Sequence, residues 1–233
     1  DGSSGWRVRA RHRLHEPERP VDRAADADIV ALLGGCCSAR DRLIVLLMAR
    51  AGLRRGEALG LRRGDVHLLT DSRELGCEVA RAHLHVVRRD GNPNGAVAKS
   101  RRERAVPLDF LVVQAFDSYE FERMGVPAAA SGDFVFVNLQ RAPVGAPMRL
   151  DAVNDLVTAA AKRAGTGALR PHQLRHSFAS NVIDAGGTLE EAQDLLGHAS
   201  ITSTQVYTHP DPARLRAAVD AVPSPRAQAG DQA

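Results

Sequence analysis

Apolar positions recur at helical spacing along most of this chain, and a glycine follows nearly every such stretch. The first helix is predicted to run from a cap at Asp26 or Asp28 to Leu33. Further helices are predicted at about 39–51, 54–60, 108–124, 151–164 and 171–185. Glycine takes the left-handed conformation that ends a helix at little steric cost, which explains the boundaries at Gly34, Gly52, Gly64, Gly125, Gly165 and Gly186.

The later predicted helices carry signals at their N-terminal ends. Asp151 can cap the helix that follows it, and Pro171 fits the first position of the next helix, where its missing N–H costs nothing. Thr188 and Glu191 form a capping box for a helix that ends at Leu196. The second half of the chain is therefore predicted to be mainly helical.

Both ends of the chain lack the regular apolar spacing of its middle. Residues 1–21 are rich in Arg, Glu and Pro and are predicted to be a linker or tail, whose opening Asp-Gly-Ser-Ser-Gly resembles a vector-derived sequence. Ser200 is predicted to cap a short helix that carries Tyr207, and a last helix is predicted over about 211–222. Residues 223–233 are predicted to be a flexible tail.

Between about residues 66 and 108 the apolar period changes from helical to two. One side of a strand would carry Val79, Arg81, His83, His85 and Val87, and the other Ala80, Ala82, Leu84 and Val86. A turn cluster at 90–95 and a return strand at about 104–108 would complete a small antiparallel sheet of three strands. The predicted fold class is α+β, mainly helical.

Basic residues concentrate in this hairpin region, in a chain whose net charge is only +3. Seven basic side chains lie between positions 81 and 104, against two acidic ones, Asp90 and Glu103. A charged run is usually a solvated face, and the alternative is a basic hairpin that contacts DNA phosphates. The side chains predicted to contact DNA are Arg88, Arg89, Arg101 and Arg102.

The cysteines and the hydropathy exclude some classes of protein. Cys36, Cys37 and Cys77 lack zinc-ligand spacing and are expected to be small buried apolar residues in a reducing compartment. There is no signal peptide and no apolar run of about 18 residues, so no membrane span is predicted. The longest apolar stretch, Leu43–Ala49, is predicted to be a core helix.

The candidate chemistry lies near the C-terminus, in two imidazoles, a guanidinium and a phenol. On a helix, His172 and Arg175 would share one face near its N-terminus, where an anion is favoured. His198 and Tyr207 follow, and Tyr207 could attack a phosphate if neighbouring cations or a base activated its hydroxyl. Taken alone, the pair His172 and Arg175 favours an ordinary exposed helix face, and Tyr207 alone favours ordinary packing. The pair His172 and His176 lacks the glutamate of a zinc protease motif, and no metal is expected.

Two further segments add charged residues to this set. Arg54 follows a glycine at a helix junction, and Glu57 could pair with an arginine to orient it, although a helix hairpin with surface charges is the alternative. Lys99 is one of only two lysines in the chain. Lysine can release its proton when its environment lowers its pKa, which arginine cannot, so Lys99 could serve as a general acid.

Together these segments resemble the catalytic domain of the tyrosine recombinases, the phage integrase family. The matching stretches are Gly-Leu-Arg-Arg-Gly-Glu-Ala-Leu (52–59), Lys-Ser-Arg-Arg-Glu-Arg-Ala-Val-Pro-Leu (99–108), His-Gln-Leu-Arg-His-Ser-Phe-Ala (172–179) and Leu-Gly-His-Ala-Ser-Ile-Thr-Ser-Thr-Gln-Val-Tyr-Thr-His (196–209). The resemblance implies a catalytic domain over residues 22–222, without the N-terminal core-binding domain of the family. The sequence departs from the family pattern at Ser100, where glycine is common, and in the long turn before Lys99.

Carried over by position, the resemblance implies a role for each candidate. The catalytic set would be Arg54, Lys99, His172, Arg175, His198 and Tyr207, supported by Glu57. Tyr207 would be the nucleophile that forms a 3′-phosphotyrosine, and Lys99 would protonate the leaving 5′ oxygen. The two arginines would stabilise the phosphorane, His172 would act as acid and base, and His198 would hydrogen-bond the phosphate.

The function that the resemblance implies is site-specific DNA recombination or integration, with no cofactor and no metal. The partners would be double-stranded DNA and other recombinase subunits in a synaptic tetramer, with no membrane partner. The protein would be cytoplasmic in a bacterium and nucleoid-associated when bound to DNA. The alternatives are a type IB topoisomerase-like enzyme and a DNA-binding regulator of recombination that does not cleave.

Overall fold

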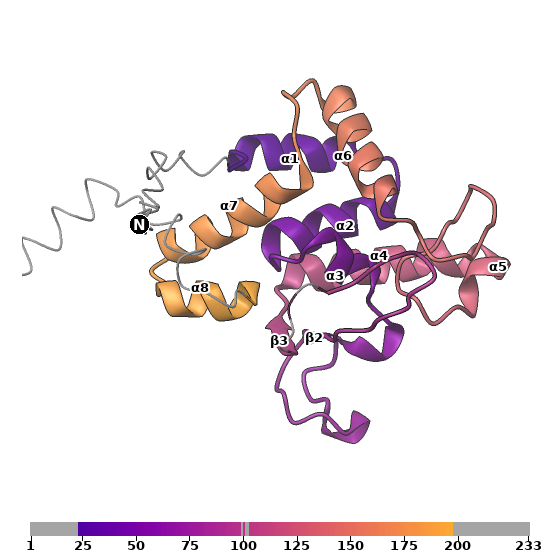
Figure 1. The fold of residues 1–233 in the computed structure, drawn as a ribbon, viewed down its shortest axis with the longest axis horizontal. Coiled ribbons are helices and arrows are strands. Elements are labelled where there is room, and N and C mark those ends of the chain that lie inside the picture. The colour runs from indigo at the N-terminus through magenta and orange to yellow at the C-terminus, as the bar shows by residue number, and fades with distance from the viewer. Residues whose placement is uncertain (1–22, 99, 101–102, 198–233) are drawn as a thin grey trace, which may run out of the picture.

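The computed structural model describes residues 23–98, 100 and 103–197 (Figure 1). Over these residues it has eight α-helices, two 3₁₀ helices and a three-stranded sheet, which confirms the predicted α+β class. The longer helices are α1 (Asp26–Gly35), α2 (Ala39–Arg50), α4 (Phe110–Met124), α6 (Asp151–Ala164), α7 (Pro171–Asp184) and α8 (Leu189–Leu196). The shorter ones are α3 (Arg55–Leu59), α5 (Pro127–Ala130), η1 (Arg63–Asp65) and η2 (Arg73–Leu75). Within this described part, no helix has both the length and the apolar character needed to cross a membrane.

Helix α2 is the central helix of the molecule and packs against both α4 and α7, while α1 packs against α6 (Figure 1). Its stretch Leu43–Ala49 is buried apart from the half-buried Leu46, which confirms the predicted core helix. The hydroxyl of Ser38 caps the helix by accepting the backbone N–H of Asp41 at 3.0 Å. A buried central helix lets its neighbours present side chains from different parts of the chain to one another.

Two polar side chains of α4 fix α5 and the segment that follows it. Tyr119 donates its hydroxyl hydrogen to the carbonyl oxygen of Val135 at 2.8 Å. The guanidinium of Arg123, which is fully buried, donates to the carbonyls of Ala129, Gly132, Phe134 and Val135. The segment 134–137 takes part in two isolated antiparallel bridges, Arg62 with Phe134 and Val137 with Pro147.

The sheet is antiparallel with the order β1–β2–β3, formed by β1 (Val66–His67), β2 (His83–Val86) and β3 (Arg104–Pro107). Its two faces are chemically different. Leu84, Val86 and Val106 are buried in the hydrophobic core, whereas His83 and His85 lie on the opposite face because side chains alternate along a strand.

The strand predicted over about 79–87 is shorter in the structure, because only its second half pairs in the sheet. Arg81 has a positive φ of 63°, which lies outside the extended region. Its backbone N–H donates to the carbonyl of Thr70 at 3.1 Å, so the two ends of the β1–β2 connection are hydrogen-bonded to each other just before β2. The alternating pattern in the sequence starts at about residue 79, before β2 itself begins at His83. The pattern therefore could not reveal the turn at Arg81.

Several helix ends differ from the predicted ones. Helix α1 continues through Gly34 to Gly35, Gly64 lies within η1, and Gly125 caps α4 with a φ of −67° instead of a left-handed conformation. The N-cap of α1 is Ala25 and that of α6 is Leu150, so the acidic residues predicted as caps lie in the first turn instead. There they still face the positive end of the helix dipole without the predicted capping bond. The capping box of α8 is confirmed, since Thr188 and Glu191 each accept the other's backbone N–H, at 3.1 Å and 2.7 Å.

Candidate active site

A single buried carboxylate, that of Glu57 on α3, holds three arginines together. Its side chain has no exposed surface. Oε1 accepts a hydrogen bond from Arg54 Nη1 at 2.9 Å, and Oε2 accepts one from Arg104 Nη2 at 2.9 Å. Nη1 of Arg175 lies 3.6 Å from Oε2. We call Glu57, Arg54, Arg104 and Arg175 the Glu57 cluster; it joins α3, β3 and α7.

The turn between α2 and α3 places Arg54 in this cluster. Gly52 in that turn has a φ of +63°, and a Cβ there would lie 2.4 Å from a ring carbon of Phe178 on α7. Glycine therefore allows both the turn and the close approach of α7. Arg54 is the N-cap residue of α3, and its backbone N–H donates to Glu57 Oε2 at 3.0 Å. The predicted pairing of Arg54 with Glu57 is confirmed, and the Arg54 side chain remains 28% exposed.

Arg175 is buried on α7, with 6% of its surface exposed. It donates to the carbonyl of Gly52 and, at 2.7 Å, to the carbonyl of Leu196. Arg54 Nη1 lies 3.4 Å from the same Leu196 oxygen. Leu196 is the last residue of α8, where helix carbonyls lack intrahelical partners and carry partial negative charge. The two arginines predicted to bind phosphate therefore also fix the C-terminal end of α8.

Arg104 is a member of the cluster that sequence reasoning missed, because it counted only as one more basic residue of the hairpin. Its side chain is 8% exposed, and Nε donates to the carbonyl of Leu195 at 2.8 Å. A signal was present in the alternation. Arg104 lies two residues before the buried Val106, on the face of β3 that points to the core. An arginine on a core face needs a buried acid as partner, and Glu57 is that acid.

Gly197 closes the cluster from the side of α8. It caps α8 in the left-handed conformation, with a φ of +63°. A Cβ at this position would lie 2.5 Å from Nη1 of Arg104. The glycine is therefore needed twice, for the turn and for the close approach of the guanidinium.

The charges of the cluster determine the ionisation of its acid. Burial alone would raise the pKa of Glu57, because a charged carboxylate loses its hydration. The hydrogen bond and charge of Arg104, followed by the charge of Arg175, outweigh burial, so the pKa of Glu57 is lowered below its ordinary value. Glu57 is therefore an ionised positioning group rather than a proton donor.

His172 lies on the first turn of α7 and is exposed, in contrast to the buried Arg175 one turn later. Its ring packs edge-on against the ring of His176, with the two centroids 5.8 Å apart. The i, i+3 placement of His172 and Arg175 on one helix is as predicted, with His172 exposed and Arg175 buried.

Five of the predicted site residues lie outside the described residues: Lys99, Arg101, Arg102, His198 and Tyr207. Two of them lie close in sequence to described residues at the Glu57 cluster. His198 follows Gly197 directly, and Arg104 is five residues after Lys99. The short helix predicted around Tyr207 and the last predicted helix also fall outside the described range.

The two described arginines predicted to contact DNA are both paired with acids. Arg89 makes a two-pronged ion pair with Asp65, with distances of 2.7 Å and 2.6 Å. Arg88 is exposed and lies 3.3 Å from the carboxylate of Asp90. Asp65 is nearly buried, so its partner also serves to neutralise an internal charge. DNA contact by these residues remains a prediction.

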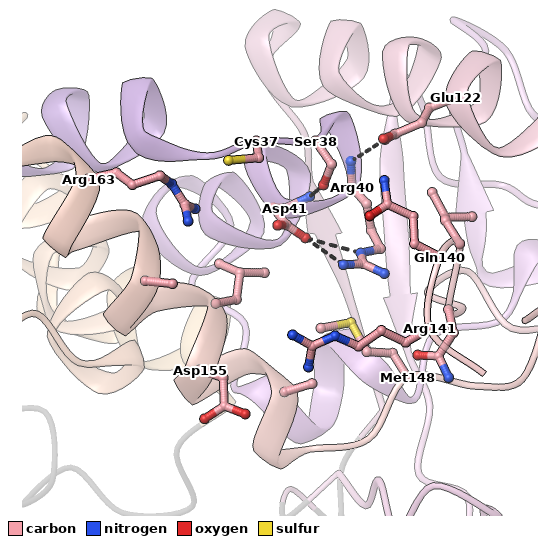
Figure 2. Close-up of a pocket in the computed structure, with 15 residues that line it drawn as sticks. Cys37, Ser38, Arg40, Asp41, Glu122, Gln140, Arg141, Met148, Asp155 and Arg163 are labelled. Atoms are coloured by element: carbon pink, nitrogen blue, oxygen red, sulfur yellow. Dashed lines mark hydrogen bonds and ion pairs between the residues drawn. The ribbon is translucent and has the colours of Figure 1, made fainter. Parts of the chain in front are cut away.

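A pocket of about 520 Å³ opens between α2, α6 and the segment 138–141 (Figure 2). Its wall carries both signs of charge, including Arg40, Arg141, Arg163 and Asp155. Among the residues that the structure describes, the pocket shares none with the Glu57 cluster or with the predicted catalytic set. Side chains that could hold a metal ion gather elsewhere, on the sheet face opposite to that of Arg104.

Comparison with known proteins identifies relatives of this chain. The model of the Phage integrase family matches residues 23–214. The tyrosine recombinase XerC of Xylella fastidiosa is 33% identical over 190 residues, covering 81% of this chain and 54% of the relative. Transposase A of transposon Tn554 from Staphylococcus aureus is 29% identical over 198 residues, covering 84% of this chain and 51% of the relative. The chain thus spans about half the length of these curated relatives.

Solved structures share the fold. A crystal structure of XerA recombinase has a TM-score of 0.65 at 26% identity, covering 90% of this chain and 66% of that chain. The catalytic domain of bacteriophage HP1 integrase has a TM-score of 0.51 at 21% identity, covering 86% of this chain and 95% of that domain. With the family match over most of the sequence, these likenesses show that the chain belongs to the phage integrase family, that of the tyrosine recombinases.

Proposed function

We propose that this chain carries the catalytic domain of a site-specific DNA recombinase that cuts and rejoins DNA strands through a 3′-phosphotyrosine intermediate. The observation that carries the proposal is the Glu57 cluster. One ionised carboxylate orients Arg54 and Arg175, which come from segments more than a hundred residues apart, and both guanidiniums meet the end of α8. Cations fixed before the reaction can stabilise the charge that develops on a phosphorane.

In the proposed reaction the hydroxyl oxygen of Tyr207 attacks the scissile phosphorus. A bond forms between that oxygen and phosphorus, and the bond from phosphorus to the 5′ oxygen breaks. His172 takes the phenolic proton, and Lys99 gives a proton to the leaving 5′ oxygen. Rejoining reverses these steps with a new 5′ hydroxyl, so the number of phosphoester bonds is conserved and no external energy source is needed.

The position of Arg54 supports its proposed role. Its Nη1 is held by Glu57 and Leu196, while more than a quarter of the side chain is exposed. Such a guanidinium can offer donors to a phosphate that arrives from solvent without first breaking its pairing with Glu57. Arg104 and Glu57 act as positioning residues, because they hold the arginines and the end of α8.

The names of the relatives support the same reaction class. XerC is named a tyrosine recombinase, and the Tn554 relative is named a transposase. We propose double-stranded DNA as the substrate and other subunits in a synaptic tetramer as partners of the whole protein. The proposal includes no cofactor and no metal ion in the cleavage step.

A covalent trap tests the proposal. The full product of the gene would be incubated with a random-sequence library of nicked duplexes, in buffer without added divalent cations. In such duplexes the cleaved 5′ end diffuses away, so that a covalent intermediate accumulates. We expect a denaturant-resistant protein–DNA adduct whose peptide is modified at Tyr207, and no adduct with Tyr207→Phe.

Two results would reject the proposal. The first is no adduct with any member of the library, and the second is an equal adduct with Tyr207→Phe. Relaxation of plasmids that lack the captured sequence would favour the topoisomerase-like alternative. Sequence-specific binding without an adduct would favour the non-cleaving regulator.

A further inference from the structure

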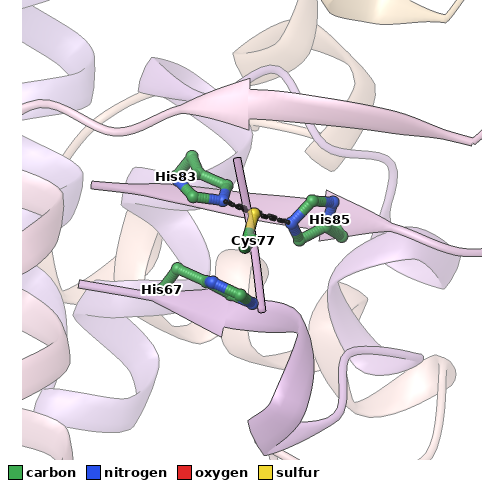
Figure 3. A group of neighbouring side chains, drawn as sticks. All are labelled: His67, Cys77, His83 and His85. Atoms are coloured by element: carbon green, nitrogen blue, oxygen red, sulfur yellow. Dashed lines mark hydrogen bonds between the residues drawn. The ribbon is translucent and has the colours of Figure 1, made fainter. Parts of the chain in front are cut away.

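Three histidines and one cysteine meet on the face of the sheet that is turned away from the hydrophobic core (Figure 3). His67 on β1 and His83 on β2 are direct partners across the antiparallel pair. His85 lies two residues further on β2 and therefore on the same face. Cys77 comes from the β1–β2 connection, just after η2, and reaches between the rings. One ligand atom from each of the four residues lies within 4.8 Å of the others.

The spacing of these atoms matches a tetrahedral metal site. Cys77 Sγ lies 3.3 Å from His83 Nε2 and 3.4 Å from His85 Nε2, and the two Nε2 atoms are 3.1 Å apart. With bonds of about 2.0–2.1 Å to nitrogen and about 2.3 Å to sulfur, tetrahedral geometry places ligand atoms about 3.3–3.6 Å from one another. An ion at the centre would therefore need shifts of only a few tenths of an ångström from these three atoms, and the ligand atom of His67 lies within 4.8 Å of them.

His83 is held in the form that a metal requires. Its Nδ1 lies 2.7 Å from the carbonyl oxygen of Arg81, which can only accept a hydrogen bond, so Nδ1 carries the proton. In the neutral ring the lone pair is then on Nε2, the atom that faces Cys77 and His85. A backbone carbonyl that fixes the tautomer in this way is typical of the surroundings of metal-bound histidines.

A hydrogen-bonded cluster without a metal leaves one atom unexplained. Nδ1 of His67 is buried and has no hydrogen-bond partner in the structure, while Nε2 of the same ring faces the carbonyl of Gly64 at 3.3 Å. The residue is 9% exposed, so a lone pair without a partner is costly there. The three rings are also crowded, with centroids 4.7–4.9 Å apart. A cation bound among them would use this lone pair.

We propose that His67, Cys77, His83 and His85 bind one zinc ion. Three imidazole nitrogens and one thiolate suit a borderline-soft divalent cation in tetrahedral geometry. All four positions would be filled by the protein, which is the pattern of a structural site rather than a catalytic one. The site is independent of the proposed recombinase chemistry and takes no part in cleavage.

The role of the site follows from the connection that it fastens. Residues 68–82 join β1 to β2, and among them only Ser72 is fully buried. Leu69 and Leu75 are exposed, so this connection buries little apolar surface of its own. A metal bound by Cys77 and by both strands would cross-link the connection to the sheet.

Metal content and cobalt spectroscopy test the proposal. The tag-free protein would be stripped with a chelator and titrated with Co²⁺, and separately loaded with Zn²⁺, dialysed and measured for bound metal. We expect one zinc ion per chain, visible absorption of tetrahedral Co²⁺ and a thiolate-to-cobalt charge-transfer band. Cys77→Ala and His85→Ala should lose the bound metal and these bands, whereas Cys37→Ser, which changes an exposed cysteine elsewhere, should keep them.

Zinc should also raise the melting temperature of the stripped wild-type protein and of Cys37→Ser, and leave that of Cys77→Ala unchanged. A folded wild-type protein that binds no zinc, or cobalt spectra that are equal in wild-type and Cys77→Ala protein, would overturn the proposal. The wild-type titration decides the matter even if a variant fails to fold. These readouts need no DNA, so failure of the recombinase proposal would leave them unaffected.

Discussion

The ion pair between Glu57 and Arg104 joins α3 to β3 across 47 residues of sequence, with Oε2 and Nη2 2.9 Å apart. Both side chains are almost fully buried, at 0% and 8% exposure. Both charged groups have lost their hydration in this buried pair. Removing either one therefore leaves the other charge buried without its partner.

Replacing Arg104 should therefore destabilise the protein strongly. Arg104→Ala leaves the Glu57 carboxylate with fewer partners in a buried site, and we expect a loss of about 3 kcal/mol in the free energy of unfolding. Urea denaturation of wild type and variant would measure it. The matched control is Arg73→Ala, which breaks the exposed pair with Asp71 and should leave stability unchanged. Equal effects of the two substitutions would contradict the structural role of Arg104.

Acid should weaken the Glu57 cluster in a defined pH range. The pKa of Glu57 is lowered from an ordinary value of 4.5, so the stabilisation from its ionised form is complete above that pH and is lost as pH falls through the lower folded-state pKa. Glu57→Gln cannot ionise and lacks this term at every pH. The difference in unfolding free energy between wild type and Glu57→Gln should be constant above pH 4.5 and narrow below it. A difference that stays constant into strong acid would contradict the lowered pKa.

Local sequence signals anticipated the helices because each depends on neighbouring residues. The run Leu43–Ala49 is buried in the central helix, and Thr188 with Glu191 satisfies backbone groups within one turn. The pairing of Arg54 with Glu57 was likewise within reach, since both lie at one helix start. The family motifs then brought distant segments into one predicted site.

The group of histidines with Cys77 and the burial of Arg104 depended on strand register and on tertiary contacts. Alternation placed His83 and His85 on one side of a strand, but His67 joins them only through its pairing across β1 and β2. Cys77 lies beside the histidines because the connection that carries it turns back at Arg81, which has a positive φ. No pattern in the sequence predicted this turn. The burial of Arg104 follows from the packing of α8 against β3. Alternation along β3 placed Arg104 on the core face, but spacing along the sequence carries no information about strand register or about which distant elements pack together.

Gly197 offers a test of how closely α8 approaches Arg104. Gly197→Ala places a methyl group 2.5 Å from Nη1 of a guanidinium that Glu57 and Leu195 hold in place. Gly165→Ala is the matched control, because Gly165 caps α6 with a similar φ of +67° and has open space around it. Both changes should cost about 1–2 kcal/mol for the left-handed backbone, and Gly197→Ala should cost more in denaturant unfolding.

The additional cost should depend on Arg104. In an Arg104→Ala background the methyl group meets no guanidinium, so Gly197→Ala and Gly165→Ala should then be equally destabilising. If Gly197→Ala is no worse than its control in the wild-type background, the close approach of α8 to Arg104 is wrong.

A comparison of Arg54 with its neighbour Arg55 distinguishes the effect of positive charge in general from the effect of a guanidinium held in position. Arg54 is held by Glu57, whereas Arg55 is exposed on the first turn of α3. Arg54→Ala should lower the rate of adduct formation on nicked DNA by about 100- to 1,000-fold, which is typical for loss of one preorganised donor. Arg55→Ala removes the same charge one residue away and should change the rate little. Similar losses in both variants would indicate nonspecific attraction to DNA instead.

The two tyrosines of the chain should respond oppositely to removal of their hydroxyl groups. Burial is the main cause that raises the pKa of Tyr119 to about 12, and its hydroxyl is bonded to the Val135 carbonyl inside the core, so it cannot serve as a nucleophile. Tyr119→Phe should cost about 0.5–1.5 kcal/mol of stability through the lost hydrogen bond and leave the adduct intact. Tyr207→Phe should abolish the adduct. Peptide mapping of the wild-type adduct decides between them, and a phosphopeptide containing Tyr119 would require a different active site from the one built around Glu57.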